Sequence, residues 1–290
     1  MRLDYRDKKQ FLAAIRKLAK SNKVTPQIML QEVVLDELLD KIAHSRFRDN
    51  LVLKGGFLIA SLLGTDTRST RDIDTSIKGL PVEKTEILNV FQEICQIELP
   101  NDDIRLQITS IKDIRETAEY SGYRLHIRAK IFTSLVDVKI DVTTGDVITE
   151  RAVNYGHKLL LENRTIEIMA YNVETIIAEK LQTIVNLGTL NTRLKDYYDL
   201  YMFANKQPSS VDFELLRKAI IATAENRNDT KYLGHYAEHI KALIDDDVLA
   251  THWLKYQSEN SYAVNITFKD TCTAALKLVK ESQIDLLQKD

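Results

Sequence analysis

The sequence predicts an α/β fold in which a mixed β-sheet is flanked by helices and followed by a helical C-terminal half. Three observations support this class. Between residues 51 and 150, short runs rich in Ile, Val, Tyr and Thr alternate with helical patterns. From about Tyr171 the pattern is helical to the end, with few turn signals. The 290 residues, 44% of them hydrophobic, are enough for a full core.

The N-terminal region is expected to form two helices within residues 5–45. Apolar residues recur there at helical spacing, and the pattern breaks between Ser21 and Pro26. Thr25 is suited to cap the second helix because its hydroxyl can accept a hydrogen bond from the first turn. Pro26 is favourable at the first helical position.

The central region holds the predicted sheet. A turn at Gly55 and Gly56 precedes a short apolar helix over 57–63, and a strand-like run around Asp72 and Asp74 follows. Further elements are a helix over 84–97 and strands over 106–111, 123–132 and 135–142.

In the C-terminal half, Asn172 is suited to cap a helix over 173–187, and Thr192 a helix over 193–205. No flexible Gly/Ser linker separates the two halves, which are therefore expected to pack as one body. We predict three regions: N-terminal helices over 1–50, an α/β core over 51–165 that carries the chemistry, and a helical domain over 166–290 that closes the active-site cleft.

Composition narrows the function classes. The formal net charge of −2 means that any contact with a polyanion needs a local basic patch. One predicted strand offers such a patch, since Arg124, Arg128 and Lys130 share its polar face. Cys95 and Cys272 lack metal-ligand spacing, which fits a reducing compartment. The N-terminus has charges where a signal peptide needs an apolar core, and no run approaches the ~20 apolar residues that span a bilayer. We therefore expect a soluble cytoplasmic protein.

Asp72 and Asp74 carry the strongest chemical signal. Positions i and i+2 of a strand point to the same face, so the two carboxylates can converge on one site. They repel each other unless a cation lies between them. Mg²⁺ prefers oxygen ligands and is usually held by one or two carboxylates together with substrate phosphates. Gly55 and Gly56 lack a Cβ, so a phosphate could approach the backbone N–H groups that begin the next helix. The pattern predicts a Mg²⁺ site, with Mn²⁺ as the alternative metal.

Asp141 is a candidate for a third carboxylate at this site. Within 135–142, apolar residues share one strand face, and Asp137, Lys139 and Asp141 share the other. Asp141 could therefore ligate the metal, or act as a general base toward an acceptor hydroxyl. The alternative is a solvated face on which the three charged residues pair crosswise.

The helical half supplies a candidate lysine. Lys180 lies at the margin of an apolar stripe, where it either places a fixed positive charge against a bound phosphate or only extends along the surface. On the next helix Asp196 and Asp199 face the same way. We assign Asp196 to the site and Asp199 to helix support through an i,i+4 pair with Lys195, although either aspartate could instead orient Lys180.

Three basic residues surround the turn and the acids: Lys54, Arg68 and Arg71. They are expected to bind phosphate oxygens, unless each pairs with a nearby acid. The chain contains no P-loop, no Gly-x-Gly-x-x-Gly and no Gly-x-Ser-x-Gly motif, which argues against three common enzyme classes.

Together these motifs resemble the AbiEii toxin family of the nucleotidyltransferase superfamily. The resemblance implies a nucleotidyltransferase fold and Mg²⁺-dependent transfer of a nucleoside monophosphate from an NTP to an acceptor hydroxyl, with release of pyrophosphate. It also implies a type IV toxin–antitoxin or phage-defence (abortive infection) role, with a cognate antitoxin encoded nearby. In relatives of this kind the acceptor can be the 3′ end of tRNA. The matching segments are Lys54-Gly55-Gly56, Arg68 through Asp74, Lys139-Ile140-Asp141, Lys180, and Lys195 through Asp199.

Other functions stay open. The chain could be a catalytically degenerate module that binds a nucleotide or a protein, although the complete set of three acids argues against this. The same metal site could serve phosphoester hydrolysis or glycosyl transfer, but the preceding Gly-Gly turn favours nucleotidyl transfer. The acceptor could also be a protein, since the residues do not identify it.

Overall fold

The computed structural model describes residues 5, 7–64, 70, 72–99, 104–115, 121–206 and 208–289. The chain divides into two compact units, and each is described by itself. The first unit comprises Met1–Asp146 and Ala152–Ala170, and the second comprises Val147–Arg151 and Tyr171–Asp290.

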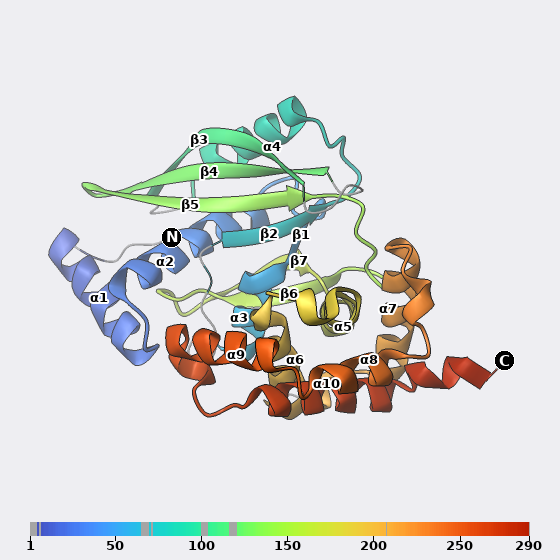
Figure 1. Cartoon of the computed structure of the whole chain (residues 1–290). Helices are drawn as coiled ribbons and strands as arrows, with labels where there is room; N and C mark the ends of the chain where they lie inside the picture. Colours follow the sequence, from blue (N-terminus) through green and yellow to red (C-terminus); the bar gives the residue numbers. More distant parts are fainter. Residues whose placement is uncertain are drawn as a thin grey trace. The chain divides into compact units, whose positions relative to one another are not determined.

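The first unit is built on a seven-stranded mixed sheet with the strand order β3-β4-β5-β2-β1-β7-β6 (Figure 1). Strand β2 pairs in parallel with β5 and antiparallel with β1, and β1 pairs in parallel with β7. The expected mixed sheet is thus confirmed. The strands are β1 (Leu51–Lys54), β2 (Asp72–Ile77), β3 (Ile104–Arg115), β4 (Ser121–Ile131), β5 (Ser134–Thr143), β6 (Val153–Lys158) and β7 (Thr165–Ala170).

Helices α2 and α4 pack on the sheet, α2 against β5 and β7 and α4 against β3. The apolar residues of the central strands, such as Leu125, Ile127 and Ile140, are fully buried. Thr25 caps α2 as expected, with its side chain accepting from the Ile28 N–H. The helices of this unit are α1 (Lys8–Ser21), α2 (Pro26–Ala43), α3 (Gly55–Leu63) and α4 (Lys84–Gln96).

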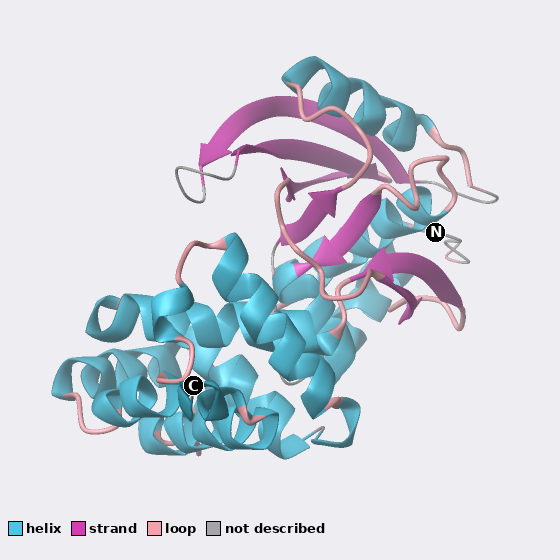
Figure 2. Cartoon of the chain, turned by 90° about the vertical axis from the view of Figure 1, so that its right-hand side faces the viewer, coloured by secondary structure: helices cyan, strands magenta, loops and turns pink. Residues whose placement is uncertain are grey.

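All regular elements described in the second unit are helices (Figure 2). Asn172 caps α5 as expected, since its side chain accepts from the Thr175 N–H. Helix α6 begins at Leu194, one residue later than expected, and the side chain of Asn191 accepts from the Arg193 N–H just before it. The main helices are α5 (Val173–Leu187), α6 (Leu194–Lys206), α7 (Phe213–Asn226), α8 (Tyr236–Leu243), α9 (Asp247–Glu259) and α10 (Phe268–Ser282).

None of the helices in the described ranges combines the length and the apolar character needed to cross a bilayer.

Candidate active site

The acidic residues of the first unit lie in register on adjacent strands. Asp74 of β2 is directly opposite Asp141 of the parallel strand β5. Lys54 of β1 lies on the other side of Asp74, and Arg124 of β4 lies on the other side of Asp141. Directly paired residues point to the same face of a sheet, and so does Asp72, two positions before Asp74. One face of four neighbouring strands therefore carries a row of cation, acid, acid and cation, with a further acid beside it.

The Gly-Gly turn seats the carboxylate of Asp74. Gly55 has a φ of 68°, and a Cβ built on it would lie 2.0 Å from Asp74 Oδ2. The backbone N–H of Gly56 donates to the same oxygen at 3.4 Å. Because the N-terminus of α3 carries partial positive charge, it favours an anion at this position. The turn that we expected to receive a phosphate thus holds Asp74.

Arg124 grips Asp141 at two points. Its Nε donates to Oδ1 of Asp141 at 2.7 Å, and its Nη2 donates to Oδ2 at 2.6 Å. This bidentate hydrogen bonding raises the pKa of Arg124. Burial offsets part of the increase, and the negative charges of Asp141, Asp72 and Asp74 raise the pKa further. Arg124 is therefore a fixed positive charge that interacts electrostatically with all three acids.

Asp137 lies on β5 four residues before Asp141. Arg128 binds it in the same manner, with its Nε 2.7 Å from Oδ1 of Asp137. The hydrogen bond from Arg128 lowers the pKa of Asp137. The acids of β5 thus pair with arginines on β4, rather than crosswise with Lys139 along their own strand.

Lys54 is also engaged. It is 7% exposed, and its ammonium group lies 2.8 Å from Asp146 Oδ2. The hydroxyl of Thr143 donates to the same carboxylate. The hydroxyl of Thr70 lies 3.2 Å from Asp72 Oδ1. Arg68 and Arg71, both expected to bind phosphate, lie outside the described residues.

In the second unit, Lys180 of α5 contacts both acids of α6. Its Nζ lies 2.6 Å from Asp196 Oδ1 and 2.9 Å from Asp199 Oδ2. A spacing of three residues puts the two acids on one helix face, so both can point at the lysine. Asp199 is fully buried in this contact, whereas Lys195, its expected partner, is exposed. Both acids therefore hold Lys180 in place.

Comparison with known proteins identifies the family. A family model described as the nucleotidyl transferase AbiEii toxin of type IV toxin–antitoxin systems matches residues 37–273. The chain belongs to this family. The match contains every residue of the two clusters described above.

Two solved structures share the fold of this AbiEii chain. One, from H. pylori and assigned as a nucleotidyltransferase, has a TM-score of 0.50 at 16% identity and covers 91% of this chain and 97% of its own. The other, JHP933 from Helicobacter pylori, has a TM-score of 0.51 at 17% identity and covers 91% of this chain and 94% of its own. No curated protein matches the chain. At such identities the likeness shows the fold alone, which agrees with the expected nucleotidyltransferase fold.

The donor chemistry of the AbiEii chain fits a magnesium ion. Among the residues that the structure describes, no three His, Cys, Asp or Glu side chains converge in a ready-made metal cage. Arg124 uses both oxygens of Asp141, which leaves Asp72 and Asp74 as the principal donors. Two carboxylates are what Mg²⁺ usually takes from a protein when substrate phosphates complete its coordination.

Proposed function

We propose that this AbiEii-family chain is a Mg²⁺-dependent nucleotidyltransferase that acts in the cytoplasm. It would move a nucleoside monophosphate from an NTP onto an acceptor hydroxyl and release pyrophosphate. The observation that carries this proposal is the register of Asp74 with Asp141 across two parallel strands, beside the turn at Gly55 and Gly56.

Each residue has a part in the proposed reaction. Asp72 and Asp74 would hold Mg²⁺, or Mn²⁺ in its place, which when bound neutralises phosphate charge. Asp141 would complete the metal site or accept the proton of the attacking hydroxyl, and Arg124 fixes its orientation. Lys180 would oppose the charge that develops on pyrophosphate, held in position by Asp196.

The phosphate-binding part of the proposal rests on the turn. The start of α3 is a helix N-terminus of the kind that binds anions. Lys54, Gly55, Gly56, Arg68 and Arg71 are proposed to contact the triphosphate. Lys54 would do so by exchanging its contact with Asp146 for one with a phosphate oxygen.

The polar face of β3, β4 and β5 supports an RNA acceptor. Its basic residues are mostly exposed and lie next to the acids, since Lys112 pairs with Arg124 and Arg124 with Asp141 in the strand register. Phosphate contacts by Lys and Arg position a nucleic acid without reading its sequence. We propose the 3′ end of tRNA as the acceptor, and an antitoxin encoded nearby as the regulator of a phage-defence toxin. The residues of this basic face are Arg105, Lys112, Arg124, Arg128, Lys130 and Lys139.

The experiment is a transfer assay. Purified protein is incubated with Mg²⁺, each α-labelled NTP in turn, and tRNA, total RNA or protein as acceptor, and both acceptor label and pyrophosphate are measured. Asp74→Asn should reduce transfer by about a hundredfold or more, because it removes a metal donor. Asp141→Asn and Lys180→Gln should also lower transfer.

Asp137→Asn is the matched control. Asp137 lies on the same strand as Asp141 and has the same kind of arginine partner, but it is more exposed and outside the row of acids. Replacing the Asp137 carboxylate with an amide should leave transfer unchanged. Tight NTP binding without transfer would favour a binding module instead, and equal transfer by Asp74→Asn and wild type would show that the site is misplaced.

A further inference from the structure

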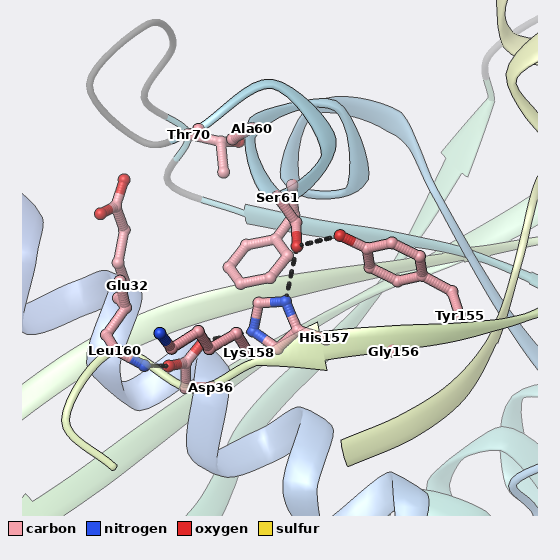
Figure 3. Close-up of a pocket in the computed structure, with 12 residues that line it drawn as sticks. Glu32, Asp36, Ala60, Ser61, Thr70, Tyr155, Gly156, His157, Lys158 and Leu160 are labelled. Atoms are coloured by element: carbon pink, nitrogen blue, oxygen red, sulfur yellow. Dashed lines mark hydrogen bonds and ion pairs between the residues drawn. The ribbon is translucent and has the colours of Figure 1, made fainter. Parts of the chain in front are cut away.

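A cavity of about 360 Å³ lies in the first unit, between α2, α3 and β6 (Figure 3). Phe57, Ala60 and Leu160 supply apolar surface, and Glu32 and Ser61 supply polar groups. Small-molecule sites typically have volumes of roughly 300 to 1,000 Å³, with a mostly apolar lining and a few convergent polar groups. The cavity has this composition.

Most polar groups of the cavity are saturated by one another. Ser61 Oγ lies 2.7 Å from both the Tyr155 hydroxyl and His157 Nδ1, and His157 Nε2 lies 2.8 Å from Asp36 Oδ1. The other oxygen of Asp36 accepts from the Leu160 N–H at 2.7 Å. This chain of hydrogen bonds links α2, α3 and β6, and it leaves little capacity for a ligand.

The hydrogen-bonded series contains a serine, a histidine and an aspartate, which are the residue types of a serine hydrolase. The placement of Ser61 argues against that chemistry. Such enzymes put the serine on a sharp turn beside free backbone N–H groups. Ser61 instead lies within α3, where the neighbouring N–H groups are used by the helix. We therefore assign a structural role to this series of hydrogen bonds.

Glu32 is the polar group that remains. It is 2% exposed, and among the described residues its carboxylate has no hydrogen bond of full geometry and only partial compensation from the backbone of Thr70. Glu32 lines the cavity, and its carboxylate lies apart from the hydrogen-bonded residues Ser61 and His157 (Figure 3). A buried carboxylate with so little compensation is costly, and such a group is normally paired. A ligand that brings a positive charge and N–H donors would remove this cost.

We propose that this cavity binds a small organic cation, whose primary ammonium group pairs with Glu32 and whose short apolar stem contacts Phe57 and Ala60. The charges of the described lining residues agree with a cation, since Glu32 and Asp36 line the cavity from α2 and the lysine among them, Lys158, is exposed. An anion would meet both acids.

The test uses the full chain and isothermal titration calorimetry at pH 8, with n-butylammonium and agmatine as probes and n-butanol as the neutral analogue. Both cations should bind, and n-butanol should bind roughly tenfold more weakly or not at all, because it lacks the charge-assisted hydrogen bond. Glu32→Gln should weaken the cations by roughly tenfold to a hundredfold. Glu83→Gln, an exposed acid outside the cavity, should leave binding unchanged.

Three further measurements test the proposal if Glu32→Gln folds poorly: two other variants and the pH dependence of binding. Lys158→Met removes a like charge from the cavity lining and should tighten cation binding, whereas Ala60→Met fills the space and should abolish it. Binding should also weaken below about pH 7, because burial raises the pKa of Glu32 to about 7. Asp36, His157, Tyr155 and Lys158 face the same cavity and contribute to that profile. Failure of both cations to bind, or equal binding of n-butanol, would overturn the proposal.

Discussion

At the scale of single residues, Gly55 is a position of the candidate active site that has no room for a side chain. A Cβ there would overlap the Asp74 carboxylate, and its φ of 68° is unfavourable for other residues. Gly55→Ala is expected to lower the free energy of unfolding by about 1 to 3 kcal/mol and to displace Asp74, with loss of transfer activity. Urea denaturation and the transfer assay measure the two effects.

Gly188→Ala is the control for this prediction. Gly188 also has a positive φ, 54°, but nothing lies within 4 Å of a Cβ built on it. It should lose about 1 kcal/mol of stability and no activity. Equal activity losses in both variants would mean that backbone strain, and not the Asp74 contact, explains the effect.

Glu32 should make the stability of the protein depend on pH. Burial, together with the nearby charge of Asp36, raises its pKa from an ordinary 4.5 to about 7, and the backbone of Thr70 offsets part of this. The folded state therefore binds the proton more tightly than the unfolded state, so the wild type loses stability as the pH rises from 4.5 to about 7. Glu32→Gln removes this loss, and its stability relative to wild type should rise by on the order of 3 kcal/mol across that window.

Urea denaturation at several pH values between 5 and 8 measures this difference. Glu83→Gln, which changes an exposed acid, should run parallel to wild type. A constant difference between Glu32→Gln and wild type over that range would contradict the burial of an ionisable Glu32.

At the scale of elements, sequence patterns succeed where local chemistry decides. The caps at Thr25 and Asn172 were readable because a side chain and a nearby N–H suffice. The contact of Arg124 with Asp141 was also within reach of the sequence. Ile131 faces Ser134 across a two-residue turn, and stepping back along both strands brings Arg124 opposite Asp141. This inference requires knowing which two residues form the turn, and the strand pattern alone does not identify them.

Strands β6 and β7 were not predicted, although β7 alternates buried Ile166, Ile168 and Ala170 with more exposed residues. In β6 the one fully buried position is a histidine, His157, and the strand also contains Gly156. Its burial depends on Asp36 in α2, which lies far away in sequence. Local propensity has no access to such a partner, and so neither the strand nor the cavity beside it could be anticipated.

The β4–β5 hairpin permits a direct comparison of its two arginines. Arg124→Gln leaves Asp141, which is nearly buried, without its bidentate partner, and should cost about 1 to 2 kcal/mol. Arg128→Gln breaks an exposed pair with Asp137 and should cost less than about 1 kcal/mol. The first variant should also lose transfer activity at every acceptor concentration, whereas the second should keep its kcat and at most raise the KM for the RNA acceptor, because Arg128 lies on the proposed basic face. Urea denaturation that ranks the two in the opposite order would contradict the difference in burial.

At the scale of the whole molecule, the two units are interleaved along the chain. Val147–Arg151 belongs to the second unit, and the chain then returns to the first unit to add β6 and β7. The segment belongs there by its bonds, since the Thr149 N–H donates to Thr175 Oγ1 and the Thr149 carbonyl accepts from Asn172. From the change to a helical pattern we predict a boundary between residues 165 and 166, but such a pattern cannot reveal an excursion that only these tertiary contacts define.

This interleaving predicts how the chain can be divided. A fragment of residues 1–170 keeps all seven strands, whereas a fragment of residues 1–146 lacks β6 and β7. In the shorter fragment β1 becomes a sheet edge with buried apolar residues, which favours aggregation. Asp36, fully buried, also loses both His157 and the Leu160 N–H, and an unpaired buried charge costs about 3 to 5 kcal/mol. We expect the longer fragment to be monomeric with a near-UV circular dichroism signal, and the shorter one to elute as aggregates in size-exclusion chromatography. If the shorter fragment were equally monomeric and ordered, the contacts of β6 and β7 would not be needed to complete the first unit.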